Sequence, residues 1–131
     1  MTIFENKFLA VQNDEEQHFL SADWKTSTAN MNRDEHEQLL HKLQELAKTV
    51  KPTSIMFNLS NFYYAMDESE QEALAQVSIE AMHEGLAKCA LIPSKGVMEQ
   101  SAVEQTVKKV ENNLPIRFFR DELTAKQWLG E

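Results

Sequence analysis

Apolar and polar residues near the start of the chain alternate in a way that is typical of β-strands. The runs Lys7–Gln12 and His18–Lys25 flank the polar residues 13–16, so we predict two antiparallel strands joined by a short turn. In the second run every other side chain is apolar, which predicts a sheet with one buried face. These apolar side chains are Leu20, Ala22 and Trp24.

Two later segments carry apolar residues at helical spacing and begin with a capping signature. The first is predicted to start at Asn32, with Glu35 three residues later, and the second near Asp67, with Glu70 three residues later. Gly85 suits the C-terminal end of the second helix. The predicted inner faces are Leu39, Leu40, Leu43, Leu46 and Ala47 in the first helix, and Leu74, Val77, Ala81 and Met82 in the second.

Two more helices are predicted toward the C-terminus. Ser101 and Glu104 fit a capping box for a third helix, and a start near Lys95 is the alternative. Asp121 is expected to cap the last helix. The expected inner faces are Val103, Val107 and Val110 in the third helix and Ala125, Trp128 and Leu129 in the fourth.

Short apolar runs between the helices predict the remaining strands. Ile55–Leu59 follows the helix stop at Pro52 and reads as a central strand that is buried on both faces. Lys88–Ile92 and Pro115–Phe119 complete the set. The sequence thus predicts an α/β fold in a single domain, residues 1–131. Its mixed five-stranded sheet has an N-terminal antiparallel pair, then parallel crossovers, and about four helices.

Composition and charge narrow the class of partner. The chain has 131 residues, 42% hydrophobic and 26% charged, which is typical of one globular domain. Its net charge of -8 repels phosphate backbones and anionic lipids, so we expect neither nucleic acid nor membrane insertion.

Cysteine usage and the N-terminal residues suggest a compartment. Cys89 is the single cysteine, which agrees with a reducing environment, and its apolar neighbours predict an inert core thiol. Residues 1–8 lack the pattern of a signal peptide, and no run approaches the roughly 20 apolar residues of a membrane span. A cytoplasmic location is expected.

Two short motifs make the chain similar to a known family. They are the run Asn58–Asn61 after a central strand and the closing Phe118–Glu122, followed by Ala125 and the pair Trp128 and Leu129. With the leading hairpin, these residues resemble the STAS-like domains of bacteria, which are related to anti-sigma-factor antagonists. The resemblance covers nearly the whole chain and implies a regulatory domain that binds partners.

The resemblance also implies where a phosphorylation switch would lie, and there the sequence departs from the family pattern. Asn58 stands where the antagonists have an Asp, and Asp67 matches their second Asp. Glu68 occupies the phosphorylatable position, and Ser69 follows one residue late. Modification of Ser60 or Ser69 is left open by the sequence, whereas acidic residues in a first turn are also explained by the helix dipole.

The four histidines do not predict a metal site. His36 and His41 are five residues apart, roughly 140° around a helix, and cannot face one ion. We interpret both as solvated helix positions, His18 as a strand residue and His83 as a favourable residue at a helix C-terminus. No cofactor and no metal is expected.

The candidate binding site is an aromatic loop after the central strand. Ligands of open α/β sheets bind beyond the carboxyl ends of the strands, where this loop and Lys95 are expected to meet. Aromatic side chains there can line a pocket or anchor a partner, or two of them can fold back over the core. The candidate residues are Ser60, Asn61, Phe62, Tyr63, Tyr64, Met66 and Lys95.

Two functions from different classes follow. The first is a non-enzymatic regulatory or binding module that recognises a protein partner or a small apolar ligand through residues 60–66 and the following helix start; a homodimer is a variant of it. The alternative is a small-molecule enzyme with a pocket at the same sheet end, with Ser60, Asn61, Tyr63 and Lys95 as its polar groups.

Overall fold

The computed structural model describes residues 1–130, which form one mixed sheet flanked by helices on both faces. The strands are β1 (Thr2–Glu5), β2 (Leu9–Asp14), β3 (Phe19–Trp24), β4 (Ser54–Asn58), β5 (Lys88–Ile92) and β6 (Ile116–Phe118). The helices are α1 (Arg33–Val50), α2 (Glu68–His83), α3 (Val97–Val110) and α4 (Glu122–Leu129), with a 3-10 turn over Thr26–Asn30.

The sheet has six strands in sequence order, so the prediction of five strands was wrong. β1, β2 and β3 are antiparallel, and β3 to β6 are parallel, as expected for the hairpin and the crossovers. The added strand is β1, four residues at an edge of the sheet that pair with β2 across an irregular register. A run this short carries too little alternation to stand out in the sequence.

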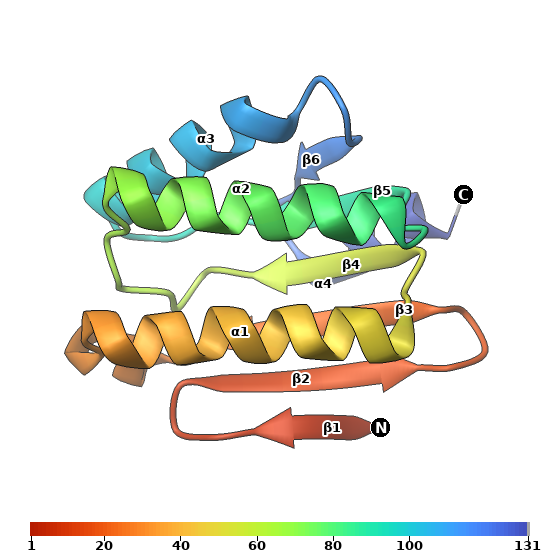
Figure 1. Ribbon diagram of the computed structural model, residues 1–131, viewed down its shortest axis with the longest axis horizontal. Helices are drawn as coiled ribbons and strands as arrows, with labels where there is room; N and C mark the ends of the chain where they lie inside the picture. The colour runs from red at the N-terminus through yellow and green to blue at the C-terminus, as the bar shows by residue number, and fades with distance from the viewer. Residues whose placement is uncertain (131) are drawn as a thin grey trace.

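Three helices cover one face of the sheet and one covers the other. Figure 1 shows α1, α2 and α3 side by side in front of the strands, with α4 behind them. Successive side chains of β4 therefore enter different cores: Ile55 joins the large core under the three helices, and Met56 joins the small core with Ala125 of α4. The expected burial of this strand on both faces is confirmed.

The predicted capping boxes of α1 and α2 are both present. Asn32 Oδ1 accepts from the Glu35 amide at 2.8 Å, and Glu35 Oε1 accepts from the Asn32 amide at 3.0 Å. The same reciprocal pair joins Asp67 and Glu70 at 2.9 and 3.0 Å. These bonds satisfy amides that the first turn leaves free, which fixes where each helix begins.

Of the other predicted helix ends, those of α2 and α4 are confirmed and the start of α3 is not. α3 begins at Val97 after Gly96, without a side-chain cap, so the capping box at Ser101 was wrong and the start near Lys95 was closer. Asp121 does cap α4, accepting from the Thr124 amide at 2.8 Å. Gly85 lies just past α2 with φ +113°, a conformation that favours glycine.

The carboxyl ends of β4 and β5 bring two loops together. Residues 59–67 follow β4 and residues 93–96 follow β5. Ser94 Oγ donates to the Phe62 carbonyl at 2.8 Å, so the expected meeting of these loops is confirmed. The two loops close one end of the space between the sheet and the three helices.

Candidate functional site

A cavity of about 80 Å³ lies in the large core, between the sheet and helices α1, α2 and α3. Helix α2 forms its outer wall through Leu74 and Ser78, while β4 and β5 form its floor through Phe57 and Leu91. Its other lining residues are Trp24, His36, Leu40, Leu43, Leu59, Phe62, Met66, Cys89, Val103, Thr106, Val107, Val110 and Ile116.

The cavity wall is almost wholly apolar. The hydroxyls of Ser78 and Thr106 donate to carbonyls one turn earlier in their own helices, at 3.0 and 2.9 Å. Burial raises the pKa of the Cys89 thiol to about 12, which agrees with the predicted inert core thiol. An empty cavity of this size costs on the order of 2 kcal/mol of stability at roughly 24 cal/mol per Å³. A ligand that filled it would remove that cost.

One polar pair lies at the edge of this apolar space. His36 of α1 and Glu70 of α2 have side chains that are 1% and 4% exposed, and Nδ1 of His36 lies 2.8 Å from Oε2 of Glu70. The interpretation of His36 as a solvated position was therefore wrong, because the ring faces inward against Trp24 and Tyr64. The pair joins the two helices above the sheet.

Tyr64 completes the polar cluster. Its hydroxyl donates to Oε2 of Glu70 at 2.6 Å, and its ring stacks on His36 with centres 4.6 Å apart. Glu70 also accepts from the Asp67 amide through its other oxygen, so three donors surround one buried carboxylate. Burial, and then the bond to Glu70, raise the pKa of Tyr64 far above its usual value, which keeps the hydroxyl protonated as a donor.

The charge state of His36 follows from its surroundings. Burial lowers the pKa of His36, and the attraction of Glu70 opposes this only in part. The ring is thus neutral at pH 7. Because an ionised carboxylate only accepts hydrogen bonds, Nδ1 carries the proton and donates to Glu70.

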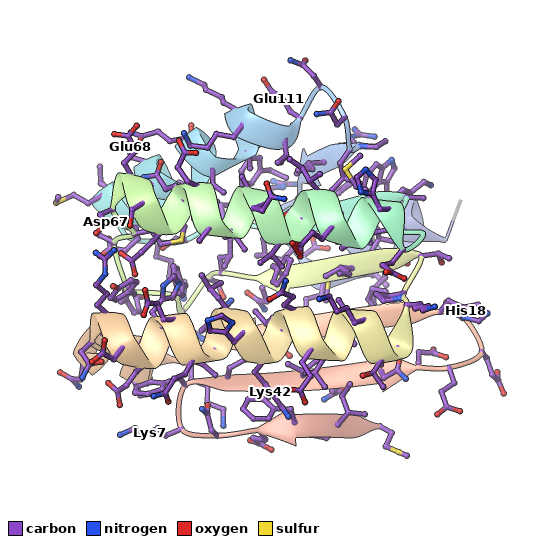
Figure 2. All side chains as sticks on the ribbon, viewed as in Figure 1. Lys7, His18, Lys42, Asp67, Glu68 and Glu111 are labelled. Carbon is purple, nitrogen blue, oxygen red and sulfur yellow. The ribbon has the colours of Figure 1, made fainter. Side chains whose placement is uncertain are left out.

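Charged residues at the start of α2 lie outside this cluster. Figure 2 shows Asp67 on the side of α2 that faces α1, and Glu68 on the opposite side. Arg33 of α1 forms an ion pair with Asp67 and donates to Ser69 Oγ at 2.6 Å. The Glu70 amide and Arg33 hold the pKa of Asp67 below its usual value. Glu68, which the resemblance aligns with a phosphorylatable residue, is exposed and carries a solvated carboxylate.

The structure divides the candidate residues of the aromatic loop between core and surface. Phe62 and Met66 are buried and line the cavity, which is the folded-back arrangement left open by the sequence. Tyr63 and Asn61 are half-buried, and Lys95 is exposed. Only part of the predicted set therefore reaches the cavity.

Ser60 belongs to a different polar group, on the side of α4. Its amide and hydroxyl donate to Asn58 Oδ1 at 3.1 and 2.7 Å, and Asn58 Nδ2 donates to Glu122 at 3.1 Å. The Asn58 that departs from the family pattern thus ties the end of β4 to α4. Neither residue contributes to the cavity wall.

His36 and Glu70 are the site residues that motif searches missed. A signal for both was present, because each extends an apolar helical face: His36 precedes Leu40 by four residues and Glu70 precedes Leu74 by four. A polar residue on such a face is placed inward, where it needs a partner.

The other histidines lie apart from the cluster. His41 is exposed, as predicted, and His83 lies in the last turn of α2. His18 is not a strand residue: it lies in the exposed turn before β3 with φ +52°. Within residues 1–130 no group of three or more His, Cys, Asp or Glu side chains is placed to hold a metal ion.

Comparisons with known proteins add no assignment to this geometry. A scan against protein-family models, a search of curated proteins and a search of solved structures found no match for the chain. Across residues 1–130, no helix has both the length and the apolar character needed to cross a membrane.

Proposed function

We propose that this chain is a non-enzymatic STAS-like binding module that holds a small apolar ligand in the cavity beneath α2. The proposal rests on the cavity itself, which has a volume of about 80 Å³ and a wall that is almost wholly apolar. Because an engineered apolar cavity of about 150 Å³ accepts benzene, this smaller space suits a molecule of roughly three to four non-hydrogen atoms. Apolar cavities of this kind stay dry and accept apolar ligands.

The STAS-like part of the proposal rests on the order of elements and on the sequence motifs. An antiparallel start, parallel crossovers and a last helix capped by Asp121 are what the resemblance implies. The docking of Ala125 and Trp128 in the small core supports the same relationship. The bacterial, regulatory and cytoplasmic parts of the proposal depend on this resemblance.

The loop at residues 59–67 offers a route from ligand to partner. Phe62 and Met66 line the cavity, whereas the neighbouring Tyr63 is half-buried. A ligand in contact with the first two side chains would restrict the loop that carries the third. We propose that a protein partner, or a second copy of the chain, binds to this loop and that its affinity depends on whether the ligand is bound. Val97 and Met98 lie at the start of α3, directly after the loop at residues 93–96, and are 87% and 74% exposed.

Extraction of bound molecules tests the proposal. The protein is purified from its native host under non-denaturing conditions, and small molecules are extracted and identified by mass spectrometry. We expect a stoichiometric apolar compound that is lost from Val107→Phe, which fills the cavity, and retained by Val97→Phe, which makes the same change at an exposed position of α3. Equal recovery from both variants, or none from the native protein, contradicts the proposal.

The second candidate is an enzyme, which one observation favours. A buried carboxylate that orients a neutral imidazole is half of the arrangement that activates a nucleophile. Within residues 1–130, however, no hydroxyl or thiol is hydrogen-bonded to His36. Hydrolysis of a small activated ester, lost in His36→Phe and kept in His41→Phe, would favour the enzyme over the binding module.

A further inference from the structure

The polar groups on the cavity wall differ in what they can offer a ligand. Nδ1 of His36 is engaged by Glu70, and no other group among residues 1–130 is hydrogen-bonded to the ring. Nε2 of His36 is therefore available, and in the neutral Nδ1–H form it is an acceptor. The bond to Glu70 holds the ring in this form.

The other polar side chains on the cavity wall are weaker candidates than His36 for a hydrogen bond to the ligand. The protons of Ser78 and Thr106 are committed to helix carbonyls, so these hydroxyls can only accept further bonds. Trp24 carries an indole N–H, and its ring centre lies 6.4 Å from that of His36. A hydroxyl group suits the imidazole, because it donates to the unprotonated ring nitrogen.

Charge on the wall argues against an ionic ligand. No Lys or Arg lines the cavity, so a carboxylate ligand would have no cation to pair with. Burial keeps His36 neutral, and the nearest charge behind it is the carboxylate of Glu70. A ligand cation would have to lose its water in an apolar space without a direct anionic partner.

We propose that the ligand of this cavity is a small uncharged alcohol whose hydroxyl donates to Nε2 of His36 while its apolar part fills the space beneath α2. This inference rests on the proposed function, because it names the class of ligand for the same cavity. It assigns to His36 the role of a specificity-determining residue, and to Glu70 that of the residue that positions the ring.

2-Propanol and 2-chloropropane test this assignment, because they have four non-hydrogen atoms each and differ in one hydroxyl donor. Their affinities are measured by NMR titration for the native protein, His36→Phe and the exposed control His41→Phe. A net hydrogen bond corresponds to about a two- to tenfold change in affinity. The affinity of 2-propanol relative to 2-chloropropane should fall by that factor in His36→Phe and stay unchanged in His41→Phe. Acetate should bind far more weakly than 2-propanol.

A second variant and a second measurement guard against a folding defect. His36→Phe leaves Glu70 buried with one donor fewer, so the ratio is also measured in His36→Phe/Glu70→Gln, in which the buried charge is removed. In the native protein, ¹⁵N NMR of His36 should show an unprotonated Nε2 whose signal moves on addition of 2-propanol and not on addition of 2-chloropropane. This signal requires no substitution in the cavity.

The outcomes separate the two proposals. If 2-chloropropane binds in the cavity but the affinity of 2-propanol relative to it is the same in the native protein and in both His36 variants, the alcohol assignment is overturned and the apolar binding module stands. A protonated Nε2 in the free protein at pH 7 also overturns it. If neither compound shows saturable binding to the native protein, the proposed function itself fails.

Discussion

Nδ1 of His36 donates to Oε2 of Glu70 across 2.8 Å, and this bond joins α1 to α2 inside a largely apolar core. It links the three features on which the proposed function depends. The capping box that starts α2 places Glu70, the apolar face of α1 places His36, and the cavity borders the ring that the two residues hold.

Replacing Glu70 by Leu should destabilise the fold strongly. The change keeps an apolar side chain of similar size but leaves the His36 N–H and the Tyr64 hydroxyl without their acceptor. Each buried donor that is left without its acceptor costs about 1–3 kcal/mol. Urea denaturation at pH 7 measures the loss. Glu72→Leu, at an exposed position of the same helix, is the control.

The double variant His36→Phe/Glu70→Leu should recover part of that loss. Two apolar residues in place of a buried pair leave fewer polar groups unsatisfied, so coupling between the two sites should be large. A cost of less than about 1 kcal/mol for Glu70→Leu alone would show that the pair is not held as described.

Tyr64→Phe isolates the third member of the cluster. The ring still stacks on His36, but the 2.6 Å bond to Glu70 is lost. Hydrogen bonds to charged groups contribute about 1.5–3 kcal/mol, so the free energy of unfolding should fall by that amount. Tyr63→Phe, one residue away, should change it little. Equal effects of the two substitutions would rule out a special role for Tyr64.

Stability should fall as the pH is lowered below about 6.5 because of His36. Its pKa in the folded protein is lower than 6.5, mainly through burial, although Glu70, Asp67 and Glu37 all act to raise it. Between the folded and unfolded pKa values only the unfolded state takes up the proton, so stability is lost by up to about 1.4 kcal/mol per pH unit. Denaturation between pH 7.5 and 5.5 should show a smaller slope for His36→Phe than for the native protein, and equal slopes would refute the assignment.

Asp23 should have the opposite pH dependence. Burial, followed by repulsion from Glu122, raises its pKa in the folded state above 3.8. Its contribution to stability is present below 3.8 and is lost as the pH rises through the folded pKa. Asp23→Asn should therefore raise the Tm at pH 7, and the gain should vanish near pH 3. Glu16→Gln in an exposed turn removes the same charge and should give no such pattern.

The parts of the fold that the sequence predicted are those fixed by local chemistry. Asn32 and Asp67 start helices through bonds to residues three positions later, and the run at Ile55 is buried because parallel strands have helices on both faces. β1 and the start of α3 were missed for local reasons too. One is a four-residue edge strand, and Gly96 offers no side chain to cap a helix.

The site was harder to predict because it depends on contacts distant in the chain. His36 and Glu70 are 34 residues apart, and only the packing of α1 beside α2 brings them together. The cavity forms where α2 and the sheet do not pack tightly, and no local pattern in the sequence predicts such a gap. Phe62 and Met66 of the aromatic loop do line the cavity, but which side chains of the loop turn inward depends on the core that receives them.

Titration of the protein with xenon, which binds in dry apolar cavities, followed by methyl NMR, tests the central claim most directly. The account predicts saturable binding at one site, with shifts at the cavity-lining Leu40, Leu43 and Leu91, in the native protein and in Val97→Phe. Val107→Phe should remain folded and lose the binding. The absence of saturable shifts in the native protein, or unchanged binding in Val107→Phe, would contradict a ligand site beneath α2.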